Sequence, residues 1–214
     1  MATVVLVHGL WMPGRDMALL ARRLRRASHT PRLFRYASTR APAAEHGAAL
    51  AGFVASLPRD GSAEVHLVGH SLGGLVIRHA LNRGIDRGID RPGRVVTLGT
   101  PHRGSSVARA LAGRRTTRWL LGRAWEDGLD GDLPPWTGAR ELGTIAGTRP
   151  HGVGQFFGPL ERPHDGTVAV AETRLPGVPH ATVATSHMGL LFSRPAAHLT
   201  ATFLATGGFG EQPA

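Results

Sequence analysis

The sequence contains no cysteine and no lysine among its 214 residues. Without cysteine the chain forms no disulfide, thiolate metal site or cysteine nucleophile, which fits a reducing compartment. No apolar run approaches the roughly 18 residues of a membrane-spanning helix. The amino-terminal MATVVLVHG also lacks the basic leader and long apolar segment of a secretory signal. We therefore predict a cytoplasmic protein.

The charge is strongly one-sided, because the 25 basic residues are all arginines and only 15 residues are acidic. An excess of this kind is compatible with anionic partners. The arginines are spread along the chain, however, and no zinc-finger, RRM or KH signature is present, so no nucleic acid partner is expected. Histidine spacing typical of a zinc site is absent. We expect neither a metal nor a cofactor, with a structural calcium at Asp127, Asp130 and Asp132 as the alternative.

The length suits one domain, residues 1–214, that buries about 70% of its unfolded surface. Short apolar runs alternate with amphipathic segments, which is typical of βαβ units and a parallel sheet covered on both faces. The predicted strands are Thr3–Val7, Arg32–Tyr36, Glu64–Val68, Arg94–Leu98, Arg140–Ile145 and Val178–Ala184. The predicted helices are Asp16–Arg26, Ala43–Leu57, Leu72–Leu81 and Pro195–Leu204, and Arg83–Arg91 reads as a surface connection.

One short stretch, VGHSLGG at residues 68–74, places Ser71 between glycines, after a predicted strand and before a predicted helix. Glycines at 69 and 73 let the strand and the helix approach closely, and a sharp turn would lift the serine hydroxyl above the sheet edge. The amino end of the helix adds N–H groups near that oxygen. The pattern predicts a nucleophile, although in a chain with 29 glycines the motif alone is weak, and a plain glycine-rich turn is the alternative.

Five segments together resemble the bacterial triacylglycerol lipases and related small esterases of the α/β-hydrolase fold. They are VVLVHGL, VHLVGHSLGGLVIR, LGTPHRGS, DGTV and SHMGLLFS, and they span residues 4 to 193. The resemblance implies a minimal α/β-hydrolase that begins at the third strand of the full fold. It would have a mostly parallel sheet of about six strands with helices on both faces. It also implies Ser71 as nucleophile and the N–H groups of Leu10 and Leu72 as the oxyanion hole.

The acid and the base follow the serine in this fold, in the order Ser, Asp or Glu, His. Asp165 lies in an Asp-Gly turn similar to the family's acid segment, and His187 lies in a loop similar to its histidine loop. The alternatives for the acid are Asp127, Asp130 and Asp132. The alternatives for the base are His151, His164, His180 and His198. Residues expected to contact substrate are Trp11, His70, Met188 and Trp119.

The stretch from Gly104 to Gly138 is too long for an ordinary connection. We interpret residues 104–138 as a lid insertion whose tryptophans and leucines would favour acyl chains. Its arginines at 114, 115 and 118 would allow transient contact with a membrane or lipid surface. The alternative is that Trp119, Trp125 and Trp136 only fasten the insertion to the domain.

These observations predict an esterase or lipase that cleaves small or medium carboxylic esters through an acyl-serine intermediate. Fold and triad do not separate this activity from that of a thioesterase, an amidase or an acyltransferase. A non-catalytic, hydrolase-like binding module is an alternative of a different class.

Overall fold

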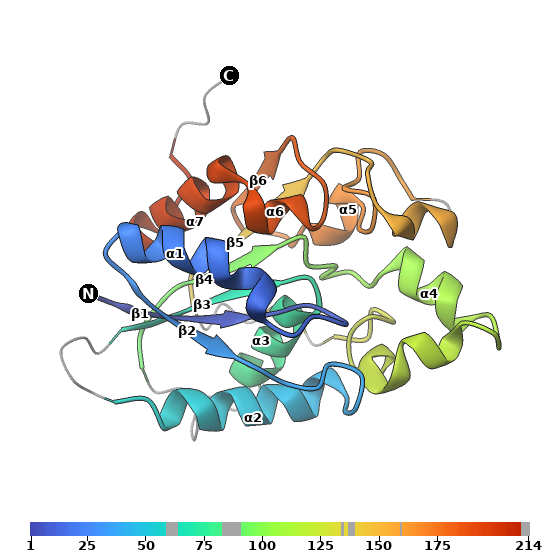
Figure 1. Cartoon of the computed structure of the whole chain (residues 1–214), viewed down its shortest axis with the longest axis horizontal. Helices are drawn as coiled ribbons and strands as arrows, with labels where there is room; N and C mark the ends of the chain where they lie inside the picture. The colour runs from blue at the N-terminus through green and yellow to red at the C-terminus, as the bar shows by residue number, and fades with distance from the viewer. Residues whose placement is uncertain (59–63, 83–90, 134, 137–139, 159, 211–214) are drawn as a thin grey trace.

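The computed structural model describes residues 1–58, 64–82, 91–133, 135–136, 140–158 and 160–210. The predicted surface connection therefore lies, except for Arg91, outside the described residues. Six parallel strands form one sheet in the order β2-β1-β3-β4-β5-β6 (Figure 1). The strands are β1 (Thr3–Val7), β2 (Thr30–Phe34), β3 (Val65–His70), β4 (Val95–Leu98), β5 (Leu142–Gly147) and β6 (His180–Val183).

Helices connect successive strands and cover both faces of the sheet (Figure 1). The α-helices are α1 (Ala18–Arg26), α2 (Ala43–Ala55), α3 (Leu72–Asn82), α4 (Ser106–Ala112), α5 (Val170–Thr173), α6 (Gly189–Phe192) and α7 (Arg194–Thr206). Short 3-10 helices are η1 (Arg15–Met17), η3 (Arg118–Leu120), η4 (Gly122–Trp125) and η5 (Val153–Phe156). The predicted α/β class with a parallel sheet of six strands is confirmed.

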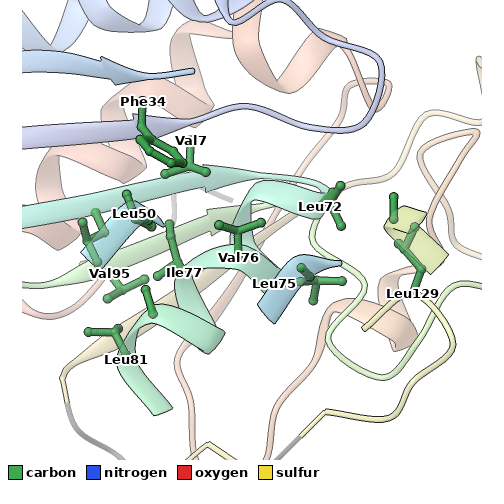
Figure 2. Close-up of a cluster of buried hydrophobic side chains, with 14 of the residues drawn as sticks. Val7, Phe34, Leu50, Leu72, Leu75, Val76, Ile77, Leu81, Val95 and Leu129 are labelled. Carbon is green, nitrogen blue, oxygen red and sulfur yellow. The ribbon is translucent and has the colours of Figure 1, made fainter. Parts of the chain in front are cut away.

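Two apolar cores lie on opposite faces of the sheet. Alternate side chains of β1 point to opposite sides, so that Val5 and Val7 join one core while Val4 and Leu6 join the other. Helices α2 and α3 cover the first core, and Figure 2 shows Leu50 of α2 and Ile77 of α3 within it. Helices α1, α6 and α7 cover the second core. Strands buried on both faces explain why the sequence shows continuous apolar runs instead of alternation.

The strand after α1 is displaced from its predicted position. The structure places β2 at Thr30–Phe34, whereas the apolar pattern predicted Arg32–Tyr36. β2 is an edge strand, where the missing N–H of Pro31 is tolerated. Tyr36 instead leaves the sheet and stacks on His8, with the ring centroids 4.4 Å apart.

The helix boundaries also differ from the predictions, by small amounts. The predicted helix Asp16–Arg26 begins with the 3-10 turn η1 and becomes α-helical only at Ala18. The carboxy-terminal helix is longer than predicted because Ser193 caps its start, accepting a hydrogen bond from the N–H of Ala196. Gly207 ends it in the left-handed conformation.

The described part of the predicted insertion, residues 104–133 and 135–136, extends beyond the carboxyl ends of the strands (Figure 1). Leu121, Ala124 and Leu129 are buried in the core that α2 and α3 cover, and Trp125 and Trp136 pack against that core. Trp119 points outward, with 72% of its surface exposed. Two of the three tryptophans thus fasten the insertion to the domain.

None of the helices in the described part of the chain combines the length and the apolar character needed to cross a membrane.

Candidate active site

Ser71 occupies the turn between β3 and α3 with a φ of 54°, in the left-handed region that residues other than glycine rarely adopt. This conformation costs about 1–2 kcal/mol. Hydrogen bonds on both sides hold it. The N–H of Ser71 donates to the carbonyl of Leu98 at 2.8 Å, and its own carbonyl accepts from Thr100 Oγ1 at 2.9 Å. The neighbouring strand β4 and the residues after it therefore fix the serine in its strained position.

The glycines around Ser71 are required by close backbone contacts. A Cβ added to Gly73 would collide with the carbonyl oxygen of Val7 in β1, and one added to Gly69 would lie 2.6 Å from the nitrogen of Gly74. Neither neighbour is a flexible side chain, so neither site accepts alanine without a backbone shift. The expected close approach of strand and helix is confirmed.

Asp165 and His187, which are 22 residues apart in the sequence, form a buried pair. His187 Nδ1 lies 2.7 Å from Asp165 Oδ2. The other carboxylate oxygen accepts the N–H groups of Val168 at 2.7 Å and Thr167 at 3.0 Å. The N–H of His187 also donates to the carbonyl of Asp165, at 2.9 Å. Because a carboxylate accepts and Nδ1 donates, Nε2 of His187 is left as the acceptor.

The electrostatic environment keeps this carboxylate charged. Burial alone would raise the pKa of Asp165, whose exposed fraction is 1%. The neighbouring His187 and the two backbone N–H groups outweigh burial, and the pKa of Asp165 is lowered from its ordinary value. A charged, fixed carboxylate is the group that orients an imidazole and stabilises its protonated form.

Ser71 and His187 line one cavity of about 190 Å³. Its wall is mostly apolar and is formed by residues from several segments that are far apart in the sequence. The apolar lining residues are Leu10, Met12, Pro101, Val107, Ala108, Leu111, Leu121, Leu129, Val168 and Met188. Half of these apolar residues come from the insertion, so this segment forms a large part of the wall: they are Val107, Ala108, Leu111, Leu121 and Leu129.

The N–H groups of the two predicted oxyanion donors, Leu10 and Leu72, differ from those of their neighbours. Among the described residues, no hydrogen bond is donated by the N–H of Leu10 or of Leu72. The N–H groups of their neighbours are used: Gly9 bonds Met12 Sδ at 3.3 Å, and Trp11 bonds Ser38 Oγ at 3.0 Å. Leu10 lines the cavity beside Ser71, and Leu72 is the first residue of α3, where N–H groups have no partner within the helix.

Three of the four predicted substrate contacts line the cavity, and the fourth does not. Trp11, His70 and Met188 are lining residues. Trp119 is not, and its indole N–H donates to the carbonyl of Thr116. Trp119 was expected to reach the cavity because it belongs to the insertion. The residues of that segment that line the cavity are instead Ser105, Val107, Ala108, Leu111, Leu121 and Leu129.

His70 contributes to the site through a backbone contact. Its Nε2 lies 3.1 Å from the carbonyl oxygen of His187, so this nitrogen is the donor. Burial is the main cause that lowers the pKa of His70 to about 3, and it therefore stays neutral beside His187. His70 thus ties the serine turn to the histidine loop.

The alternative acids and bases lie elsewhere. None of Asp127, Asp130, Asp132, His151, His164, His180 and His198 lines the cavity that contains Ser71. His180 begins β6, at the end away from the cavity, and bonds Thr173 Oγ1 at 3.0 Å. Within the described residues, no three side chains of metal-binding type cluster together, and Asp130 instead accepts the N–H groups of Gly128 and Asp132.

Sequence reasoning did not assign the contacts that three residues make in the site. Thr100 bonds the Ser71 carbonyl, Met12 accepts the Gly9 N–H, and Tyr36 holds His8. Thr100 lies in the LGTPHRGS segment, where the resemblance offered a signal. Met12 and Tyr36 act through contacts that leave no pattern in the sequence.

Comparison with solved structures shows the same architecture in bacterial proteins. The mature form of the lipase BlEst2 from Bacillus licheniformis is 20% identical, with a TM-score of 0.73 over 96% of this chain and 91% of that chain. Its propeptide form is 21% identical, with a TM-score of 0.78 over 99% and 52%. An extracellular alpha/beta-hydrolase from a Paenibacillus species is 15% identical, with a TM-score of 0.58 over 95% and 98%. At these identities the likeness shows the fold alone.

A search of curated proteins found no match. The family model described as "Alpha/beta hydrolase family" matches residues 4–207, nearly the whole chain. Sheet order, the strained serine turn and this match agree, and the chain belongs to the alpha/beta hydrolase family.

Proposed function

We propose that this protein hydrolyses carboxylic esters through an acyl-serine intermediate. The observation that carries the proposal is that Ser71 and His187 line the same cavity. Ser71 is held at positive φ, and Nδ1 of His187 lies 2.7 Å from the buried carboxylate of Asp165. This combination gives a nucleophile, a base with a defined tautomer and a group that orients the base.

In the proposed acylation, Ser71 Oγ attacks the ester carbonyl carbon while His187 Nε2 takes the hydroxyl proton. The carbonyl oxygen becomes negative, and the N–H groups of Leu10 and Leu72 would stabilise it. When the carbon–oxygen bond to the alcohol breaks, His187 returns the proton to the leaving oxygen. Asp165 remains ionised throughout, and its charge stabilises the imidazolium.

The second half of the reaction repeats the same steps with water as nucleophile. His187 takes a proton from water, the hydroxide adds to the acyl carbon, and the proton returns to Ser71 as the acid is released. The products are a carboxylic acid and an alcohol, and the enzyme is regenerated.

The cavity supports small or medium acyl groups as substrates. Its volume of about 190 Å³ is below the range of roughly 300–1,000 Å³ that is usual for pockets holding drug-sized ligands. Its apolar wall would receive a hydrocarbon chain and exclude water from the acyl-enzyme.

The insertion supports a second part of the proposal, transient contact with anionic lipid surfaces. Trp119 and Trp11 are exposed by 72% and 54%, and the Trp11 indole donates to the carbonyl of Leu120 in the insertion. Arginines at 114, 115 and 118 stand beside Trp119 in the sequence and are exposed. Aromatic and cationic side chains together favour the interface of an anionic membrane.

The test combines covalent labelling with turnover. We expect a fluorophosphonate probe to modify Ser71, as located by mass spectrometry, and the Ser71→Ala variant to remain unlabelled. On p-nitrophenyl esters of increasing chain length, kcat/KM should be highest for short to medium chains. In Ser71→Ala, kcat should fall by several orders of magnitude, on the order of 10⁴ or more.

Two results would reject the proposal. One is native protein that takes up no label and hydrolyses none of the esters, which indicates a non-catalytic module. The other is a Ser71→Ala variant that keeps near-native turnover. Faster turnover of thioesters or amides than of the matched esters would reassign the substrate class while leaving the triad in place.

A further inference from the structure

The His8 side chain is buried at the end of β1 and both its ring nitrogens are hydrogen-bonded. Nε2 accepts the N–H of Tyr36 at 3.3 Å, and Nδ1 lies 2.9 Å from the carbonyl oxygen of Gly9. Because a carbonyl oxygen only accepts, Nδ1 carries the proton. Both hydrogen bonds are therefore satisfied by the same neutral tautomer, in which Nδ1 carries the proton and Nε2 does not.

The carbonyl that His8 holds belongs to the peptide bond between Gly9 and Leu10. In a trans peptide the C=O and N–H groups are fixed in one plane and point in opposite directions. Fixing the Gly9 oxygen therefore fixes the direction of the Leu10 N–H, one of the two proposed oxyanion donors. We propose that His8 is a positioning residue that orients the Gly9–Leu10 peptide so that the Leu10 N–H is directed at the reacting carbonyl of the ester.

This inference rests on the proposed function for the identity of the reacting group, but the peptide geometry stands by itself. A Cβ added to Gly9 would lie 3.0 Å from Ser71 Cβ and 3.1 Å from His70 Nδ1, so this peptide passes directly beside the nucleophile. Glycine at 9 would otherwise leave the peptide free to rotate, since glycine adopts most backbone conformations at little cost.

Tyr36 holds the imidazole in place from the other side. Its hydroxyl donates to the carbonyl of His8 at 2.7 Å, and its ring stacks on the imidazole at an interplanar angle of 19°. Burial is the main cause that lowers the pKa of His8, which favours the neutral ring that this bond pattern needs. His8 is thus held in one orientation by the stacking of its ring on Tyr36, by the hydrogen bond to its backbone carbonyl and by the hydrogen bonds at both ring nitrogens.

Two variants separate the bond to Gly9 from the bond to Tyr36. In His8→Asn the carboxamide occupies the place of Nδ1, where its NH₂ can donate to the Gly9 carbonyl but nothing reaches the Tyr36 N–H. In His8→Gln the longer carboxamide reaches the place of Nε2, where its oxygen can accept from Tyr36 but nothing holds Gly9. Each variant loses one of the two hydrogen bonds that the ring nitrogens make. We therefore expect both variants to lower the thermal unfolding temperature by similar amounts.

With a short p-nitrophenyl ester we expect His8→Gln to lower kcat by about 10- to 100-fold with little change in KM, because complete loss of one oxyanion donor costs about 10²–10³. We expect His8→Asn to stay within a few fold of the native kcat. Equal kcat values in the two variants, while the native protein is active, would overturn the inference and leave the proposed function intact.

A readout independent of activity is the structure of the peptide itself. Crystal structures should show the native Gly9–Leu10 orientation in His8→Asn and a rotated peptide in His8→Gln, and ¹⁵N spectra of the native imidazole should show the proton on Nδ1. A native protein that proves inactive would reject the proposed function. The inference about the peptide would then be decided by these two measurements, and a proton on Nε2 or an unrotated peptide in His8→Gln would reject it.

Discussion

Asp165 uses its two carboxylate oxygens for different purposes. Oδ2 accepts from His187 Nδ1, while Oδ1 accepts two backbone N–H groups. An asparagine at 165 cannot do both, because one of its ends is a donor. If its oxygen keeps the backbone donors, its NH₂ faces His187, so Nδ1 must accept and the proton moves to Nε2. That tautomer cannot take a proton from Ser71.

We therefore expect Asp165→Asn to lower kcat on an ester substrate by on the order of 10⁴ with little effect on KM. The matched control is Asp130→Asn, since Asp130 also accepts two backbone N–H groups but lies outside the cavity. Steady-state kinetics of both variants checks the prediction. If Asp165→Asn kept more than a tenth of the native kcat, another residue would have to orient His187.

At the scale of single residues, the sequence predicts what local motifs encode. Ser71, Asp165 and His187 each lie in a short segment with its own glycine or strand context, and the structure brings the serine and the histidine to one cavity. Tyr36 and Met12 support the loop after β1 only because β2 lies beside β1 and the loop folds back on itself. Such contacts depend on tertiary packing, so no spacing rule could have found them.

At the scale of elements, the strand bounds were predicted most accurately where a continuous apolar run forms the strand. TVVLV became β1 without any shift, because its three valines and its leucine all enter one core or the other. At β2 the apolar pattern was weaker, and pairing with β1 decided the register instead, with Thr3 opposite Thr30 and Val7 opposite Phe34. The position of Trp119 outside the cavity has a similar cause: the fold of the insertion determines which of its apolar residues turn inward.

The insertion also carries a prediction at this scale, about lipid surfaces. In a sedimentation assay with phosphatidylglycerol vesicles, we expect binding by the native chain that weakens as salt is raised. Replacing Arg114 and Arg115 by glutamine should weaken it by about 1 kcal/mol for each arginine removed. A charge-matched control is the double change of Arg25 and Arg26 to glutamine at the end of α1, which should bind like the native chain.

Equal weakening in both double variants would show that only net charge matters and would reject a binding face on the insertion. The Trp119→Ser variant adds a second arm, because the Trp119 ring is exposed by 72% and its removal should leave thermal stability nearly unchanged. Native binding to vesicles by Trp119→Ser would also count against the proposal.

For the whole molecule, buried histidines link folding stability to pH. Seven of the 12 histidines have a lowered pKa, and burial is the first cause in each. They are His8, His29, His46, His66, His70, His102 and His180. In the unfolded chain these rings bind protons below about pH 6.5, whereas in the folded chain they remain neutral to lower pH. The unfolded state therefore gains protons first as the solution is acidified, and the free energy of unfolding must fall.

His102 offers the clearest test of this linkage. It is buried with 3% exposure, its Nε2 lies 2.9 Å from Thr97 Oγ1, and burial lowers its pKa to about 3. Its contribution to stability is complete above about pH 6.5 and is lost progressively down to about pH 3, at up to about 1.4 kcal/mol per pH unit. Glutamine cannot titrate. We therefore expect His102→Gln to be less stable than the native chain at pH 7, but to lose less of its free energy of unfolding between pH 6.5 and 4, as measured by denaturant unfolding. The exposed His198 of α7 provides a control for the histidine-to-glutamine change itself, and the slope of His198→Gln is measured beside that of His102→Gln. An equally steep slope in His102→Gln and the native chain would mean that His102 is protonated within the folded protein in this range.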